Sequence, residues 1–315
     1  MSPLSPRSIP NILSIAGTDP TGGAGIQADL KSIAAHRGYG MCAVTALVAQ
    51  NTLGVREIHL PPVSFLRAQL DAVSEDVAID AIKIGMLGTE DTIRAVVDWL
   101  DSLGAPGDDG GSGLLGSAHG GRGVGDREVG GRSLPVLVLD PVMVATSGDR
   151  LLDAAAESAL LEFLRRADLI TPNVPELALL AGEEPAGDPE GLIAQARTVA
   201  DAHQVVVLAK GGHLDDASAQ ELVVDTLVYP AQAGVRPDEE RFVSPRIPTQ
   251  NTHGTGCSVS AALATLAARG FSFSAALPVV KEWMTEALQD SERLDVGQGH
   301  GPIQHFAQLW GGSAP

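Results

Sequence analysis

Short apolar runs alternate along the chain with longer segments in which apolar positions recur every three or four residues. The short runs are bounded by glycine or proline, which is typical of strands buried on both faces of a sheet. We predict strands at 12–16, 43–49, 79–84, 136–139, 168–170 and 205–209, and helices at 25–36, 65–77, 89–100, 154–166, 189–202 and 258–268. This alternation indicates an α/β fold with a mostly parallel central sheet and helices on both faces.

Two parts of the chain depart from the alternation. Segments 221–229 and 241–247 are predicted to form an antiparallel pair late in the sheet. Residues 104–133 are rich in glycine and carry few large apolar groups, so they cannot bury enough surface to offset their ordering entropy. We interpret 104–133 as a flexible surface insertion, 1–10 as a disordered leader, and 1–315 as a single domain.

Charge and cysteine content narrow the classes of partner. The formal net charge of −18 argues against a nucleic acid or an anionic membrane, because both favour an excess of lysine and arginine. No apolar run is long enough to span a bilayer, and the first ten residues lack the apolar core of a signal peptide. The two cysteines, Cys42 and Cys257, suggest neither a disulfide framework nor a zinc site. We therefore expect a cytoplasmic protein.

A glycine-rich turn opens directly into the last predicted helix. In this turn Gly254, Thr255 and Gly256 precede Cys257, so that consecutive backbone N–H groups and the positive end of the helix dipole converge on one point. We interpret this point as an anion site, where the helix is expected to lower the pKa of the Cys257 thiol toward neutrality. The alternative is a simple turn beside a small, inert, buried cysteine.

Another glycine-rich turn, residues 17–25, joins the first strand to the first helix. Its spacing does not match a dinucleotide-binding turn. Its glycines, beginning with Gly17, would let a flat ligand approach the backbone, and Asp29 on the helix would accept hydrogen bonds from that ligand or simply face solvent. Gln50 and Met86 follow other strands: the amide of Gln50 matches the edge of an aminopyrimidine-like ring, and Met86 can cover an aromatic face. A loop cap and core packing are the respective alternatives.

Charged side chains follow three further strands. Asp140 ends a strongly apolar strand, so we expect it to face a polar cleft or a cation. Glu176 lies at the next strand-to-helix junction, where it either complements the helix dipole or joins Asp140 in holding Mg²⁺. Lys210 follows the strand after that and suits a phosphate. Because carboxyl ends of parallel strands form the ligand-binding edge of such sheets, these groups are predicted to converge.

Several segments together carry a resemblance to a known family. They are AGTDPTGGAGIQADLK (16–31), ALVAQNT (46–52), KIGML (83–87), LITPNVPE (169–176), KGGHL (210–214), NTHGTGC (251–257) and VGQGHGP (296–302). In this order and at these spacings the chain closely resembles the bacterial hydroxymethylpyrimidine/phosphomethylpyrimidine kinases of thiamine biosynthesis, in the ribokinase superfamily. The resemblance runs from about residue 11 to 306, apart from the insertion. It implies a ribokinase-like fold and ATP-dependent phosphorylation of 4-amino-5-hydroxymethyl-2-methylpyrimidine, then of its monophosphate.

The resemblance also implies a role for each candidate residue. The pyrimidine would be held by Gly17, Asp29, Gln50 and Met86; the nucleotide by Asn173, Lys210 and Thr252; and Mg²⁺ by Asp140 and Glu176. Cys257 takes the position of the aspartate of related sugar kinases, so it would orient or deprotonate the attacking hydroxyl. Backbone N–H groups of Gly254, Thr255 and Gly256 would neutralise charge on the phosphoryl group.

Two alternatives and two further expectations accompany the resemblance. A pyridoxal kinase of the same superfamily would act on a similar aromatic hydroxymethyl group, and a non-catalytic ligand-binding protein could keep the fold. Members of the family are commonly dimers, so a homodimer is expected. Thr146 stands where many relatives have lysine, which puts help from that loop in phosphate binding in doubt.

Overall fold

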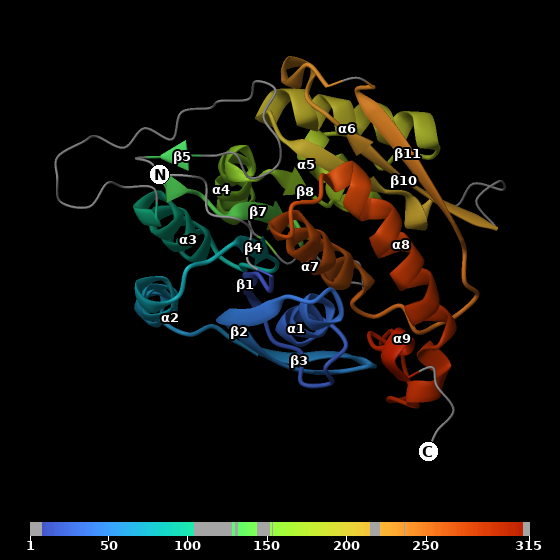
Figure 1. Ribbon diagram of the computed structural model, residues 1–315, viewed down its shortest axis with the longest axis horizontal. Helices are drawn as coiled ribbons and strands as arrows, with labels where there is room; N and C mark the ends of the chain where they lie inside the picture. Colours follow the sequence, from blue (N-terminus) through green and yellow to red (C-terminus); the bar gives the residue numbers. More distant parts are fainter. Residues whose placement is uncertain are drawn as a thin grey trace.

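The computed structural model describes residues 8–103, 128–129, 132–143, 152, 154–214, 221–235 and 237–310. Within these residues the chain forms one nine-stranded sheet flanked by helices (Figure 1). The strands are β1 Asn11–Gly17, β2 Tyr39–Asn51, β3 Gly54–His59, β4 Ala81–Ile84, β5 Glu128–Val129, β6 Arg132–Ser133, β7 Val136–Leu139, β8 Leu169–Ile170, β9 Val206–Lys210, β10 Leu222–Val228 and β11 Glu239–Pro245. The helices are α1 Gly25–Ala35, α2 Val63–Asp76, α3 Glu90–Leu103, α4 Ala154–Phe163, α5 Val174–Ala181, α6 Pro189–His203, α7 Thr255–Ala268, α8 Phe273–Gln289 and α9 Ala307–Trp310.

The large sheet has the order β11-β10-β9-β8-β7-β4-β1-β2-β3. The six strands from β9 to β2 run parallel to their neighbours, whereas β3, β10 and β11 are antiparallel. The carboxyl ends of the six parallel strands therefore share one edge. The predicted α/β class, the six strands and the late antiparallel pair are confirmed.

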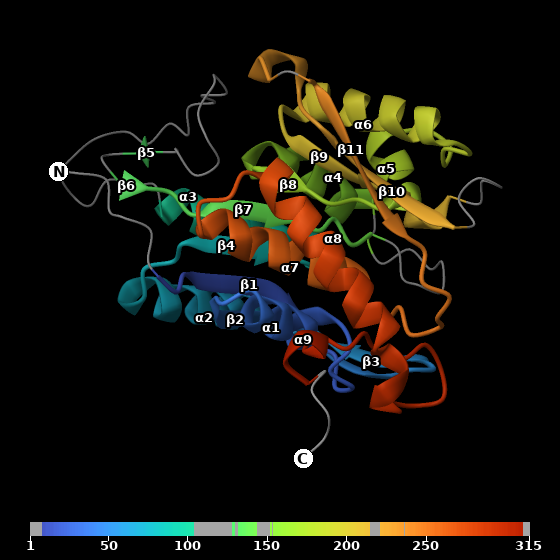
Figure 2. The same cartoon turned by 45° about the vertical axis from the view of Figure 1, so that its right-hand side comes forward.

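Helices cover both faces of the sheet. Figures 1 and 2 show α1, α7 and α8 on one face and α2 to α6 on the other. The buried strand β7 shows why both layers form: Val136 and Val138 pack with α7 and α8, whereas Leu137 and Leu139 pack with the opposite layer. Alternate residues of a strand point to opposite faces, so a strand that is apolar at every position needs a helix layer on each side.

Several elements were not predicted with their observed form, among them β3, α8 and the end of α4. Strand β3 is exposed along its whole length and forms a hairpin with β2, so it lacks the apolar alternation that marks a half-buried strand. Helix α8 contains Pro278, a residue that ordinarily interrupts a helical pattern. Helix α4 ends at Phe163 and continues only as a 3₁₀ turn over Leu164–Arg166.

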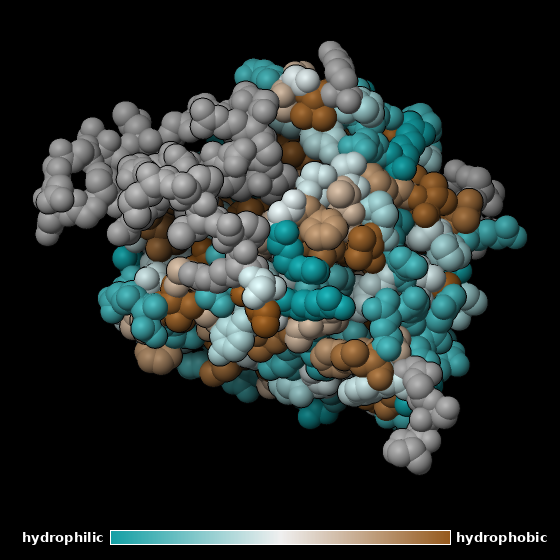
Figure 3. Space-filling view, in the orientation of Figure 1, coloured by the Kyte–Doolittle hydropathy of each residue, from teal (hydrophilic) through white to brown (hydrophobic). Residues whose placement is uncertain are grey.

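Some predictions concern residues that the structure does not describe. Most of the predicted insertion, residues 104–127 and 130–131, lies there, as do residues 1–7 of the leader and Thr146. The described end of the insertion contains the short antiparallel pair of β5 and β6. No helix among the described residues is both long and apolar enough to cross a bilayer. The face of the molecule shown in Figure 3 carries polar and apolar side chains side by side.

Candidate active site

Four of the predicted site residues gather at the carboxyl edge of the parallel strands. Gly17 ends β1, Met86 follows β4, Asp140 follows β7 and Lys210 ends β9. The Nζ atom of Lys210 lies 3.1 Å from Oδ1 of Asp140. The hydroxyl of Thr171, which follows β8, donates to the same oxygen at 2.8 Å. The sheet thus places a buried carboxylate and a lysine at the edge where ligands of open α/β sheets bind.

The first turn of α7 faces this carboxylate–lysine pair. A Cβ atom added at Gly256 would lie 3.2 Å from Nζ of Lys210 and 3.5 Å from Oδ2 of Asp140. Gly254 caps the helix in the left-handed region, at φ 82°, and a Cβ there would overlap the carbonyl oxygen of Gly23. Thr255, the first residue of α7, follows directly. The start of the helix, its dipole and the lysine therefore favour an anion at one place.

A buried aspartate joins the two glycine-rich turns. Asp19 is fully buried and accepts hydrogen bonds from the backbone N–H groups of Thr21, Gly23 and Ala24. Nε2 of His253, beside the α7 turn, lies 2.9 Å from its Oδ2. Burial would raise the pKa of Asp19, but these hydrogen bonds outweigh burial and hold the pKa well below its usual range. This contact joins residues 234 positions apart and was not predicted from the sequence.

Asn173 and Glu176 form the start of α5. The Asn173 side chain accepts from the Glu176 N–H, and the Glu176 carboxylate accepts from the Asn173 N–H, each at 2.9 Å. This is a capping box. Burial raises the pKa of Glu176 to about 7, against the effect of Lys210, and the negative charge of Asp140 adds to the rise. Glu176 therefore stabilises the helix start and also lies within the electrostatic reach of Asp140.

Asp140 and Lys210 stabilise each other's charged forms. Burial opposes the charge on Asp140, yet Lys210 and Lys83 outweigh it and lower the pKa of this carboxyl. The same balance, with Asp140 and Glu176 as the partners, raises the pKa of Lys210. Both groups are thus ionised at neutral pH. Thr252, the remaining predicted nucleotide residue, accepts through its carbonyl from the Thr255 N–H at 3.3 Å, so it shapes the turn before α7.

The thiol of Cys257 does not have the lowered pKa expected at a helix start. Burial raises its pKa to about 11, and the carboxylates of Asp29 and Asp140 add to the rise. Lys83 and a hydrogen bond from the Gly25 N–H oppose this rise without reversing it. The expectation of a near-neutral pKa was wrong because it considered only the helix, and neither the burial of the thiol nor the two carboxylates that the fold brings close. Cys257 is therefore mainly a thiol at neutral pH.

Gly17 and Met86 lie together on the other side of the site. A Cβ added at Gly17 would lie 2.8 Å from Cε of Met86, so the glycine leaves room for the methionine. The hydroxyl of Thr45 donates to the Met86 carbonyl at 2.7 Å and fixes that loop. Gln50 lies in β2 opposite Val55 of β3, and the register of the two strands shifts between Ala49 and Gln50, where Arg56 of β3 is the extra residue.

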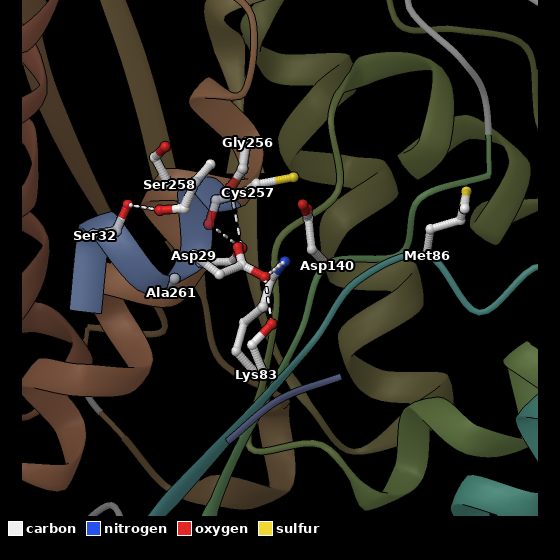
Figure 4. A network of polar contacts seen from close by, with 12 residues as sticks. Asp29, Ser32, Lys83, Met86, Asp140, Gly256, Cys257, Ser258 and Ala261 are labelled. Atoms are coloured by element: carbon white, nitrogen blue, oxygen red, sulfur yellow. Dashed lines mark hydrogen bonds and ion pairs between the residues drawn. The ribbon is translucent and has the colours of Figure 1, made fainter. Parts of the chain in front are cut away.

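Asp29 lies behind the site instead of on its surface. Its side chain is fully buried, and Oδ2 accepts from Nζ of Lys83 at 2.9 Å and from the Ser14 hydroxyl at 2.6 Å. Figure 4 shows this cluster beneath the first turn of α7, where Cys257 and Asp140 point into the same space. Because Oδ2 is engaged by Lys83 and Ser14, the contact of Asp29 with a pyrimidine stays a prediction. The sequence analysis missed Lys83 as a site residue, although a lysine inside the apolar run of β4 was a visible signal.

Comparison with known proteins places this geometry in a family. The profile of the phosphomethylpyrimidine kinase family matches residues 19–106 and 112–304, which include almost all of the residues described above. The chain belongs to this family. The resemblance seen in the sequence motifs is therefore confirmed.

Relatives within the phosphomethylpyrimidine kinase family are similar over nearly the whole chain. The hydroxymethylpyrimidine/phosphomethylpyrimidine kinase of Salmonella typhimurium is 41% identical over 301 residues, covering 95% of this chain and 98% of the relative. The thiamine biosynthesis multifunctional protein of Corynebacterium glutamicum is 50% identical over 300 residues, covering 95% of this chain but 34% of the relative. The chain thus spans about a third of the length of that relative.

Solved structures similar to this member of the family include kinases of two kinds. A pyridoxal kinase of Bacillus subtilis in complex with ADP has a TM-score of 0.76 and 30% identity, and covers 96% of this chain and 100% of its own. A phosphomethylpyrimidine kinase of Clostridium difficile has a TM-score of 0.67 and 30% identity, and covers 89% and 99%. Both likenesses confirm the predicted ribokinase-like fold.

Proposed function

We propose that this protein is an ATP-dependent kinase that phosphorylates the hydroxymethyl group of 4-amino-5-hydroxymethyl-2-methylpyrimidine and then phosphorylates the resulting monophosphate to the diphosphate, in thiamine biosynthesis. The observation that carries the proposal is the convergence, at one edge of the sheet, of the α7 turn, Lys210, Asp140 and Cys257. Phosphoryl transfer uses such groups: N–H donors and a lysine for the phosphate oxygens, and a carboxylate for a metal ion. The Cys257 thiol beside them can orient the attacking hydroxyl. Relatives that bear this activity in their names support the substrate.

Different residues would bind the nucleotide and the pyrimidine. Lys210 and the backbone of Gly254, Thr255 and Gly256 would hold the phosphates of ATP, with Asn173 and Thr252 at the nucleotide side. Similar pyridoxal kinases have been solved with ADP and with AMP-PCP, which supports an adenine nucleotide. Gly17, Gln50 and Met86 would hold the pyrimidine. Asp29 would support the floor of the site from behind, through the buried pair with Lys83.

The donor set fits a Mg²⁺ ion. Asp140 and Glu176 are both buried carboxylates, and burial together with the charge of Asp140 raises the pKa of Glu176 against the effect of Lys210. No group of three or more histidine, cysteine, aspartate or glutamate residues within the described parts of the chain forms a metal site. Two carboxylates that leave further positions to water and phosphate are the usual protein ligands of Mg²⁺. When bound, the ion would neutralise charge on the transferring phosphoryl group.

In the reaction, the hydroxymethyl oxygen attacks the γ-phosphorus and the bond from that phosphorus to the β,γ-bridging oxygen breaks. The N–H groups of α7 and the Lys210 ammonium stabilise charge on the phosphoryl oxygens. Cys257 orients the hydroxyl and, in its thiolate form, accepts its proton. Because the transition state of such transfers is loose, positioning and electrostatics supply most of the rate enhancement, and a small thiolate fraction suffices.

Turnover with ATP, Mg²⁺ and the hydroxymethylpyrimidine tests the proposal, with monophosphate and diphosphate separated by ion-exchange chromatography. We expect the monophosphate to form first and the diphosphate to follow. Cys257→Ala should lower kcat by about 10²–10⁴ and change KM by less than about three-fold. Absence of both products would contradict the proposed substrate, and full activity of Cys257→Ala would remove this residue from the mechanism.

Pyridoxal is a second candidate substrate, because pyridoxal kinases are among the similar structures and one of them was solved with pyridoxal. The ratio of kcat/KM for pyridoxal to that for the pyrimidine decides between the two alcohols. We expect a ratio well below one. A protein that turns over ATP with neither alcohol would be a non-catalytic binder on the same fold.

A homodimer is part of the proposal. Several apolar side chains on and beside the β2–β3 hairpin are exposed, namely Leu47, Leu53, Val55 and Ile58, with exposed fractions of 43–72%. Such a patch on an edge strand is typical of a surface that pairs with a second copy. Light scattering of the purified protein should give twice the chain mass, and Val55→Lys should shift it toward the monomer.

A further inference from the structure

A fully buried ion pair lies directly behind the proposed nucleophile-activating residue. Lys83 of β4 and Asp29 of α1 both have side chains with an exposed fraction of 0%. The Ser14 hydroxyl of β1 also donates to Oδ2 of Asp29. Oδ1 of Asp29 has no hydrogen-bond partner among the described residues. A buried ion pair gives little net stability compared with apolar side chains of the same volume, so stability alone does not account for it.

The pair is positioned against Cys257 by helix and strand geometry. Asp29 follows Gly25 by four residues in α1, so the two lie on the same face of that helix. Figure 4 shows Asp29 and Lys83 next to the first turn of α7, below Cys257. Lys83 precedes Gly85, at which an added Cβ would lie 2.8 Å from Nζ of Lys83. The lysine is therefore enclosed, and its ammonium group cannot leave the cluster.

The charges around Cys257 come from four elements. Lys83 lies on β4 and Lys210 on β9, whereas Asp29 lies on α1 and Asp140 follows β7. Burial opposes the charge on Lys83, but Asp29 and then Cys257 and Asp140 outweigh it and raise its pKa, so Lys83 is always cationic. Lys210 is the cation expected to turn to phosphate. That leaves Lys83 as the cation available to balance a negative sulfur.

We propose that Lys83 is a positioning residue that stabilises the thiolate form of Cys257, and that Asp29 sets the strength of this effect by holding and partly neutralising Lys83. The proposal deepens the proposed kinase function, on which its role in turnover rests. The electrostatic coupling itself is a property of the protein without substrate. A structural pair and a charge-setting pair make different predictions for the thiol.

The test measures the alkylation rate of Cys257 by iodoacetamide between pH 7 and pH 11, without ATP or pyrimidine. All variants are made in a Cys42→Ser background. Cys42 and Cys257 are the two cysteines of the chain, so only Cys257 can then be alkylated as a thiol. In that background Lys83→Met should slow alkylation at pH 8 by about ten-fold, the effect of raising a thiol pKa by one unit. Asp29→Asn should speed it by a similar factor, because Lys83 is then no longer neutralised. Lys83→Arg should stay close to the background.

Opposite signs distinguish the two roles. If the pair were only structural, Lys83→Met and Asp29→Asn would change the alkylation rate in the same direction, and that result would overturn the proposal. An unchanged rate in Lys83→Met would overturn it too. Should Lys83→Met not fold, the double variant Asp29→Asn with Lys83→Met removes both charges, and its alkylation at pH 8 should be slower than that of Asp29→Asn alone. Failure of pyrimidine turnover would leave these results unaffected, so the two proposals fail separately.

Discussion

Gly256→Ala separates the stability of α7 from its proposed function. Gly256 is the second residue of the helix and has ordinary helical backbone, since it is not among the residues with positive φ. Alanine is favoured over glycine in helices by about 1 kcal/mol. The folded protein should therefore lose no stability from the backbone. The added methyl group, however, would lie 3.2 Å from Nζ of Lys210 and 3.5 Å from Oδ2 of Asp140.

That methyl group occupies the space in which the helix start and Lys210 would hold a phosphoryl group. Loss of one donor to a transition-state oxyanion lowers kcat by about 10²–10³ in well-studied enzymes. We expect Gly256→Ala to lower kcat by at least this factor. The methyl group would separate the phosphoryl oxygens from both the N–H groups and the lysine. The melting temperature should stay equal to that of the wild type or rise.

Steady-state turnover with ATP, Mg²⁺ and the pyrimidine, together with a thermal melt, gives both quantities. Gly191→Ala is the matched control: Gly191 lies in the first turn of α6, and its N–H caps onto Asp188. This control should gain similar stability at unchanged kcat. A Gly256→Ala protein with wild-type kcat would show that the phosphoryl group does not bind at the start of α7. A strongly destabilised one would show that Lys210 cannot yield to the methyl group.

Three further predictions test other parts of the site. Gln50→Ala should raise the KM for the pyrimidine about 10–100-fold at nearly constant kcat, whereas the exposed Gln232→Ala should change neither; an unchanged KM would count against Gln50 as a pyrimidine ligand. The Mg²⁺ activation constant should rise about five-fold from pH 7 to pH 6, because Glu176, with a pKa of about 7, becomes protonated as the pH falls. Glu176→Gln keeps the capping box and should abolish this pH dependence. A wild type with the same constant at both pH values would refute the role of Glu176 as a Mg²⁺ ligand. His253→Leu should lower the free energy of unfolding in urea by about 1–3 kcal/mol, because the buried Asp19 loses a partner, whereas the exposed His300→Leu should cost less than about 0.5 kcal/mol; equal losses would argue against the Asp19 contact.

Local patterns were enough to predict the sheet and the edge at which the site lies. The strand at Val136–Leu139 was predicted with its observed bounds because four consecutive apolar residues between Pro135 and Asp140 fit a strand buried on both faces. Asp140 and Lys210 were predicted at the site because each ends such a strand, and parallel strands align their carboxyl ends. Gly254 and Gly256 were predicted because the turn chemistry of a helix start is local.

Contacts between distant parts of the chain could not be predicted in this way. Asp29 and Lys83 are 54 residues apart, and only the packing of α1 against β1, which pairs with β4, shows that they meet in the interior. The pKa of Cys257 depends first on burial and then on these two residues and Asp140, so reasoning from the helix start alone gave the wrong direction. Strand β3 has no buried face that would impose a pattern on its sequence. In each case the missing quantity was the burial and charge of neighbours supplied by other elements.

Removing both charges of the Asp140–Lys210 pair should affect folding little, whereas removing either charge alone should destabilise the protein. Asp140 has an exposed fraction of 4% and Lys210 of 17%, so removing only the lysine leaves a carboxylate that is largely shielded from water. Lys210→Met is expected to lower the free energy of unfolding by about 3 kcal/mol. The double variant Asp140→Asn with Lys210→Met removes both charges and keeps an acceptor for Thr171, so it should recover most of that loss while remaining inactive. Urea denaturation of the two single variants and the double variant measures this coupling. If the double variant were as unstable as Lys210→Met, the pair would be a structural requirement of the fold, and its place at the sheet edge would not by itself indicate a phosphate and cation site.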